Sequence, residues 1–226
     1  MTAPTLDELR LQIGRMEGRA GAEPVATHPA LAGLLQLRTG GTYAVSSAAL
    51  AGLLMAGPSG DGAWCGIVGG GAAHGVASLG LQALAEAGVE LSRCVLVPDP
   101  GAAWLEVAAA LVDVLGVVVV TPPSRVGEGE AARLVARLRK RGAILICRGD
   151  WPRVDARVGL TDVRWTGVGD GHGHLRARQA TVEVRVGTAP ARTRRLWLPD
   201  VDLAIREVLE VAPARTLSPP MLRSVG

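Results

Sequence analysis

Three residues with metal-binding side chains alternate in the segment DGHGH, where glycines separate Asp170, His172 and His174. In an extended strand, alternate side chains lie on one face, so a carboxylate and two imidazoles would point the same way. No further carboxylate or cysteine follows at a spacing known from metal sites, and a glycine-rich hairpin has the same composition. The pattern therefore favours a hairpin, and we expect no metal site.

In a nucleotide-binding α/β protein, the first strand should lead into a glycine-rich loop whose amides hold phosphate at a helix N-terminus. The first expected strand, 42–45, is followed by Ser46 and Ser47, with no glycine and no GK[ST] sequence. We expect these serines to cap the following helix. A second candidate is the glycine triplet at 69–71, but the GxGxxG fingerprint requires a glycine where His74 stands. A turn is the better interpretation of this triplet.

The other requirements for nucleotide or hydrolytic chemistry are also unmet. A strand that ends at Thr121 places a neutral hydroxyl where a Walker B aspartate would organise Mg²⁺. Among 24 basic residues Lys140 is the single lysine, so Schiff-base or Walker A chemistry would depend on it alone. The four histidines are scattered, and no serine lies in a GxSxG sequence. The sequence therefore predicts a protein that is not an enzyme and binds no cofactor.

Positive charge is concentrated in the later part of the chain. Segment 133–195 has a net charge of +10, from 15 basic and five acidic residues. On an expected helix over 129–141, four bases share one face opposite an apolar face. The candidate contacts to DNA or to an acidic partner are Arg133, Arg137, Lys140, Arg141, Arg192, Arg194 and Arg195. A solvated helix face is the commoner meaning of such a stripe, and DNA backbone or an acidic partner is the alternative.

These residues are positioned by short β-branched runs that alternate with longer Ala/Leu-rich segments, a pattern typical of a parallel sheet covered by helices. The expected strands are 42–45, 63–68, 93–97, 116–121 and 143–147. The expected helices are 47–56, 73–87, 102–115 and 129–141, three of them ended by Gly57, Gly88 and Gly142. The four valines at 117–120 are apolar on both faces and should lie centrally.

After Asp150 the pattern changes to expected antiparallel strands over 156–166, 175–186 and 192–198, which extend one edge of the sheet. Near the start, a helical stripe carries the candidate partner-binding residues Leu6, Leu9, Ile13 and Met16. Segment 201–211 is expected to be a helix. The expected organisation is an N-terminal helix and linker over 1–27, a core domain over 28–199, and a C-terminal helix and tail over 200–226.

The composition predicts a globular, cytoplasmic protein, with 48% hydrophobic and 20% charged residues. The longest central uncharged run, 114–120, is far shorter than the roughly 20 residues of a membrane-spanning helix, so no membrane contact is expected. Acids at positions 7 and 8 are unlike a secretory signal. Cys65, Cys94 and Cys147 lie far apart within or beside apolar runs and are expected to be buried thiols.

The order of elements over 28–199 resembles the core of the RecA family: a strand, a phosphate-loop position, five parallel strands with helices, and closing antiparallel strands. The segments HPALAGLLQLRTGGTYAV, LVPDPGAAWLEVAAALVDVLGVVVVTPP, RLRKRGAILICRGDWP and RWTGVGDGHGHL resemble actinobacterial ImuA-type proteins, RecA-like accessory factors of the mutasome. The resemblance implies an α/β, RecA-like three-layer core with a mostly parallel central sheet, extended by C-terminal antiparallel strands, plus an N-terminal helix.

The same resemblance implies a role in damage-induced mutagenesis and translesion DNA synthesis. The implied partners are an inactive Y-family polymerase homologue and an error-prone C-family DNA polymerase, with a second copy of the chain or RecA as further candidates. Because the Walker residues are missing, we expect a non-catalytic adaptor. The alternative is a recombination modulator that binds nucleotide or DNA, with weak, non-specific DNA binding.

Overall fold

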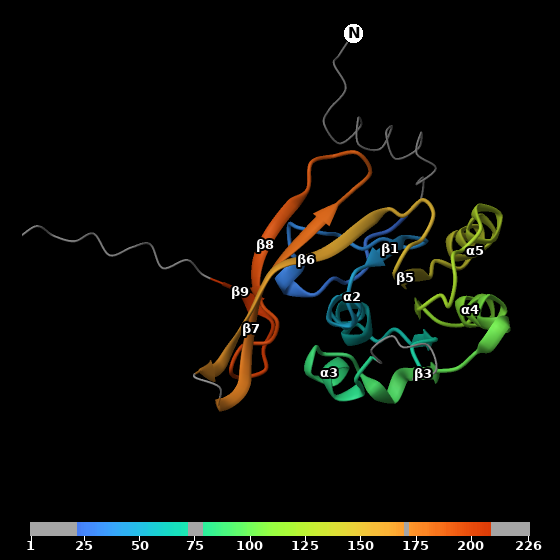
Figure 1. Ribbon diagram of the computed structural model, residues 1–226. Coiled ribbons are helices and arrows are strands. Elements are labelled where there is room, and N and C mark those ends of the chain that lie inside the picture. Colours follow the sequence, from blue (N-terminus) through green and yellow to red (C-terminus); the bar gives the residue numbers. More distant parts are fainter. Residues whose placement is uncertain (1–21, 72–78, 170–171, 209–226) are drawn as a thin grey trace, which may run out of the picture.

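The computed structural model describes residues 22–71, 79–169 and 172–208 of the 226-residue chain. In these residues the chain forms one nine-stranded sheet in the order β3-β2-β4-β5-β1-β6-β7-β8-β9 (Figure 1). The strands are β1 (Thr42–Val45), β2 (Cys65–Val68), β3 (Cys94–Val97), β4 (Val117–Val120), β5 (Ile144–Arg148), β6 (Ala156–Gly169), β7 (His172–Arg185), β8 (Arg192–Trp197) and β9 (Arg206–Glu207). The helices are α2 (Ala48–Gly60), α3 (Leu81–Glu86), α4 (Trp104–Val112) and α5 (Glu128–Arg141), with short 3-10 turns η1 (Pro29–Leu31), η3 (Leu91–Arg93) and η4 (Gly101–Ala103).

The first five strands form a parallel sheet with helices on both faces. Its central strand β4 is buried along its whole length. Val117 and Val119 pack with residues of η1, α2 and α3, whereas Val118 and Val120 pack with α4 and α5. This alternation follows from the period of two along a strand and explains why both faces of β4 are apolar. The prediction of an α/β fold with a mostly parallel central sheet is confirmed.

The later strands extend the sheet beyond β1 and are antiparallel to one another, as predicted, but the first of them, β6, joins β1 in parallel. β6 pairs in parallel with β1 through Ala156–Val158, so it continues the parallel sheet. The direction reverses between β6 and β7, and again between β7 and β8 and between β8 and β9. Alternation of apolar and polar residues indicates that one face of a strand is buried, but it does not determine whether the strand runs parallel or antiparallel to its neighbour.

Helix α2 does not end at Gly57 as expected but continues through Pro58 to Gly60. Gly57 is required for a different reason: a Cβ there would lie 2.6 Å from the carbonyl oxygen of Ala26 and 2.7 Å from the amide nitrogen of His28. The glycine therefore allows the 26–28 segment to pack directly on the helix. The other two expected helix ends are correct, because the backbone at Gly88 and Gly142 has positive φ angles of 96° and 71°.

The helix expected over 201–211 was wrong for the described part of that segment. The buried carboxylate of Asp200 accepts hydrogen bonds from the amides of Asp202 (2.8 Å) and Ala204 (2.9 Å). These bonds make a turn, and the chain then forms β9. A side chain that binds its own backbone amides competes directly with helix formation. Residues 209–211 lie outside the described residues.

Three other expectations concern the positions of cysteines and terminal segments. Cys65 and Cys147 are buried as predicted, whereas Cys94 is half-buried. Within the segment expected to be a helix over 73–87, the structure describes helix α3, and residues 72–78 lie outside the described residues. The expected N-terminal helix with Leu6, Leu9, Ile13 and Met16 also lies outside them. Among the described helices none is long and apolar enough to cross a membrane.

Candidate functional site

The carboxyl ends of parallel strands are the usual ligand position in open α/β sheets. Here β1 is joined to α2 by only two residues, Ser46 and Ser47. The Ser47 hydroxyl accepts a hydrogen bond from the Leu50 amide at 3.3 Å, which confirms the predicted cap. The Ser46 amide donates to the carbonyl oxygen of Val158 at 3.1 Å. This short turn therefore has no room for a G-x-x-x-x-G-K-[ST] loop, and its Ser46 amide and Ser47 hydroxyl already have partners within the protein.

The glycine triplet after β2 serves close packing at the same edge. Gly69 and Gly70 have positive φ angles of 83° and 84°. A Cβ on Gly69 would lie 2.6 Å from the carbonyl oxygen of Thr121, and one on Gly71 would overlap the carboxylate of Asp99. The glycines thus allow the end of β2 to approach the ends of its two neighbours, β3 and β4. His74 lies outside the described residues.

The position expected for a Walker B aspartate holds Thr121, whose buried hydroxyl has no hydrogen-bond partner among the described residues. A neutral hydroxyl cannot provide the carboxylate that organises Mg²⁺. Arg148 stands at the end of the adjacent strand β5, and burial lowers the pKa of its guanidinium.

Lys140 belongs to the last turn of α5, which begins after β4 and ends before β5. That turn lies near the amino ends of the strands, about 20 Å along the helix from the carboxyl edge.

A hollow of about 950 Å³ lies between the loops that follow β4 and β5. Its acidic groups are paired, Glu128 with Arg153 at 3.6 Å and Asp150 with Arg157 at 3.8 Å. Trp151 is buried at its edge, and its ring meets that of Trp104 edge to face, with centroids 6.5 Å apart. The described lining contains no histidine, cysteine or lysine.

The Asp170, His172 and His174 pattern gives no metal site in the described residues. His172 and His174 are exposed on β7, and Asp170 lies outside the described residues. Over 22–71, 79–169 and 172–208, no group of three or more His, Cys, Asp or Glu side chains is placed so that it could hold a metal ion.

The predicted basic face of α5 is exposed, and its apolar face is buried against α4 and the sheet. Arg133, Arg137, Lys140 and Arg141 all lie on the exposed side. Asp113, just after α4, pairs with two of them: its carboxylate is 3.4 Å from Arg137 Nε and 3.2 Å from Arg141 Nε. Part of the positive charge is therefore already neutralised within the protein.

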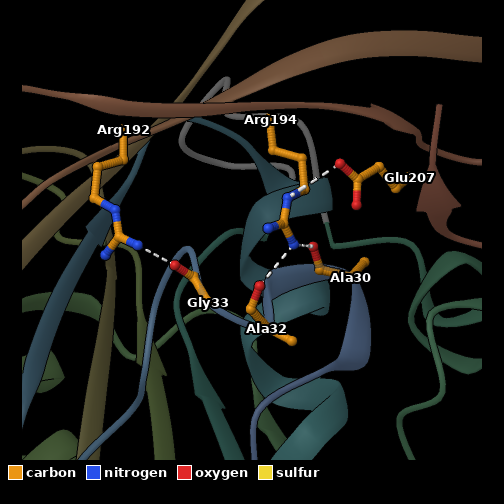
Figure 2. Close-up of polar contacts among 6 residues, drawn as sticks. All are labelled: Ala30, Ala32, Gly33, Arg192, Arg194 and Glu207. Carbon is orange, nitrogen blue, oxygen red and sulfur yellow. Dashed lines mark hydrogen bonds and ion pairs between the residues drawn. The ribbon is translucent and has the colours of Figure 1, made fainter. Parts of the chain in front are cut away.

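The arginines of β8 do not form one surface with that helix face. Successive strand residues point to opposite faces, so Arg192 and Arg194 share the face of the buried Leu196, and Arg195 takes the other face. We call residues 28–33, which include η1, the η1 segment. Figure 2 shows Arg192 directed at the carbonyl of Gly33, and Arg194 held between Ala30 and Ala32 of this segment and Glu207 on β9.

The structure also reveals a surface that the sequence analysis missed. Beyond Val158, no described strand pairs with the side of β6 that faces β1. On the other side of the hairpin, β8 pairs with β7 only over Gln179–Val184. The far part of the hairpin, which we call the distal hairpin, comprises 161–169 of β6 and 172–178 of β7. In Figure 1 it extends at the lower left, away from α4 and α5. Its exposed large apolar side chains are Val163, Trp165, Val168 and Leu175.

The signal for this surface was present in the sequence, because the strands expected over 156–166 and 175–186 were longer than any other expected strand. Their observed length is 14 residues each, whereas the parallel strands β1 to β5 have four or five. A strand three times longer than its neighbours must project beyond them.

Two comparisons place the chain among known proteins. The model of the MT3502 N-terminal domain family matches residues 30–153, more than half of the chain. The chain is also 41% identical over 86 residues to the uncharacterized protein Rv3395c of Mycobacterium tuberculosis. That similarity covers 37% of this chain and 42% of the relative, so the matched region spans less than half of the relative's length. The family match includes β1 to β5 and helices α2 to α5, which form the parallel part of the sheet and its covering helices. The chain therefore belongs to the MT3502 N-terminal domain family.

Proposed function

We propose that the protein is a non-catalytic, RecA-like adaptor of the mutasome that supports damage-induced mutagenesis and translesion DNA synthesis. In this proposal it is a cytoplasmic protein of the ImuA type. It contacts an inactive Y-family polymerase homologue and an error-prone C-family DNA polymerase. The RecA-like assignment is supported by the order of elements: a strand and a short turn at the phosphate-loop position, further parallel strands with helices, and closing strands of alternating direction.

The observation that carries the proposal is the two-residue turn between β1 and α2. The Ser47 hydroxyl caps α2, and the Ser46 amide is bonded to Val158. In a phosphate-binding loop these groups would face the ligand. Thr121 adds no charge for a metal ion, and Lys140 lies towards the opposite edge of the sheet. A parallel sheet that keeps its core but has lost these groups is best suited to a scaffold for protein contacts.

The alternative, a modulator that binds DNA, is favoured by one observation. Arg133 and Lys140 are exposed on α5, and no ion pair to another described residue is found for either side chain. Such a surface would contact phosphates without reading bases. The proposed partner-binding residues Leu6, Leu9, Ile13 and Met16 lie outside the described residues, so their support is the apolar stripe in the sequence.

Calorimetry with ATP and Mg²⁺, followed by a binding assay with the purified inactive polymerase homologue, tests the proposal. We expect no nucleotide binding and no turnover, but stable binding of the polymerase homologue. A chain lacking residues 1–20 should bind that partner less well if the apolar stripe contributes. Micromolar ATP affinity, or ATP turnover that is lost on changing Ser46 or Ser47, would contradict the adaptor role.

A further inference from the structure

The distal hairpin combines a free backbone edge with exposed apolar side chains. Trp165 is 47% exposed, and Leu175 and Val168 are each 56% exposed. Along the same hairpin, nearer β1, the side chains of Ala180, Val182 and Val184 are buried in the core under η1 and α2. The distal hairpin thus extends beyond the part of the sheet that η1 and α2 cover. A free strand edge and uncovered apolar side chains are the two features that proteins use to add a partner's strand.

One contact organises the distal hairpin before any partner arrives. The guanidinium of Arg178 lies 5.2 Å from the centroid of the Trp165 ring, and these two residues are direct cross-strand partners. Arg178 Nε also donates to the carbonyl oxygen of Leu198 at 2.6 Å, which fixes the arginine. Trp165 is therefore held in place by a stacked cation while almost half of its surface stays accessible.

We propose that the distal hairpin is a docking surface for an acidic segment of a partner protein, which pairs with the free edge of β6 and packs a large apolar side chain against Trp165. The inference rests on the adaptor role proposed above and names the chemistry of the partner. The described residues of the distal hairpin carry three arginines, at positions 164, 176 and 178, and one acid, Asp162. An acidic strand is the complement of this charge.

The observations favour a protein strand over the other occupants. Nucleic acid could stack on Trp165, but it would leave Val163, Val168 and Leu175 without apolar contacts and the backbone edge without a ladder. A second copy of this chain would bring the arginines of two hairpins together. The register of the β6–β7 ladder shifts between Thr161 and Arg164, where β6 carries the extra residue, and such a bulge in β6 discourages indiscriminate strand pairing. Recognition therefore depends on side chains as well as on the backbone.

The test is a selection of short random peptides, displayed on phage, against the immobilised full-length protein. A selected peptide is then synthesised and its affinity is measured by fluorescence polarisation. The hairpin variant is Trp165→Ala/Leu175→Ala, and the matched control is Val114→Ala/Val201→Ala, which removes exposed apolar side chains elsewhere. We expect acidic peptides with a large apolar residue, bound equally by wild type and control but about tenfold more weakly by the hairpin variant.

Two further measurements separate the contributions of charge and backbone. Arg164→Glu/Arg176→Glu should weaken binding and remove most of its dependence on salt, because both side chains are exposed. Hydrogen exchange should show that the peptide protects backbone amides of 159–169. A proline placed within the peptide should abolish that protection, since proline cannot donate to a strand ladder.

The docking proposal is wrong if no peptide is enriched, if the enriched peptides are not acidic, or if the hairpin variant binds them like the wild type. It is also wrong if the hairpin variants bind the peptide normally but lose binding of a labelled oligonucleotide or lose self-association. These results are distinguishable from failure of the adaptor role. ATP turnover would reject the adaptor, whereas equal peptide binding by the wild type and the hairpin variant would reject only the docking surface.

Discussion

Arg194 and Ala32 are 162 positions apart in the sequence, and the Arg194 Nη1 and the Ala32 carbonyl oxygen lie 2.7 Å apart. The same nitrogen is 3.2 Å from the carbonyl oxygen of Ala30 (Figure 2). The contact connects β8 with the η1 segment, which covers that end of the sheet. A side chain that was a candidate for DNA contact thus has a structural role.

We predict that Arg194→Ala lowers the free energy of unfolding by about 1–3 kcal/mol, because it leaves two carbonyl oxygens without a charged donor. Arg153→Ala is the control, since the side chain of this arginine is 88% exposed and pairs with that of Glu128, which is 78% exposed. Its cost should stay below about 1 kcal/mol. Denaturant unfolding of both variants checks the prediction. If Arg194→Ala leaves stability unchanged but weakens DNA binding, Arg194 belongs to a nucleic-acid surface after all.

Any DNA affinity should come from α5 and be limited by Asp113. Asp113→Asn removes the carboxylate that pairs with Arg137 and Arg141, so it should strengthen binding of a labelled oligonucleotide. Arg133→Ala/Arg137→Ala should weaken binding and reduce the salt dependence by about 0.7–0.9 log units per lost phosphate contact. Fluorescence polarisation from low to physiological salt measures both effects. Binding that is insensitive to salt or specific for one sequence would contradict the prediction.

Two glycines of α2 should respond oppositely to alanine. Gly57→Ala places a methyl group 2.6 Å from the Ala26 carbonyl oxygen, and that backbone cannot move without displacing the 26–28 segment. We expect a loss of about 1–3 kcal/mol in the free energy of unfolding. Gly60→Ala meets no atom within 4 Å and restricts the unfolded chain, so it should be neutral or stabilising by up to about 1 kcal/mol. Similar effects of the two changes on thermal unfolding would contradict the packing described for Gly57.

The η1 segment should also make stability depend on pH through His28. Burial lowers the pKa of this imidazole, and its Nδ1 accepts a hydrogen bond from the Ala30 amide at 3.1 Å. The unfolded chain therefore binds the proton more readily, and stability is lost as the pH falls below about 6.5. His28→Asn keeps an oxygen for the cap but does not titrate. Denaturant unfolding between about pH 7.5 and about pH 5.5 should show a smaller loss for the variant, and equal losses would exclude His28 as the cause.

The parallel part of the fold was predictable because its signals are local. Each of β1 to β5 is a short, mostly apolar run, and several boundaries between strands and helices have a cap or a glycine, such as Ser47, Gly88 and Gly142. The failed prediction over 201–211 shows the limit of such signals. Its apolar residues suit a helix, but the Asp200 carboxylate captures the amides that the helix would have used.

The sequence by itself determined the alternation of strands and helices, the central position of the four valines of β4 and the lack of a glycine-rich phosphate loop. These properties depend on residue type and on spacing within one element. Only the tertiary structure decided that Arg192 and Arg194 bind the η1 segment, that Asp113 neutralises part of α5, and that no other described element covers the distal hairpin. Such relationships join residues far apart in the chain, so the order and direction of the strands, which no local pattern encodes, determine which side chains meet.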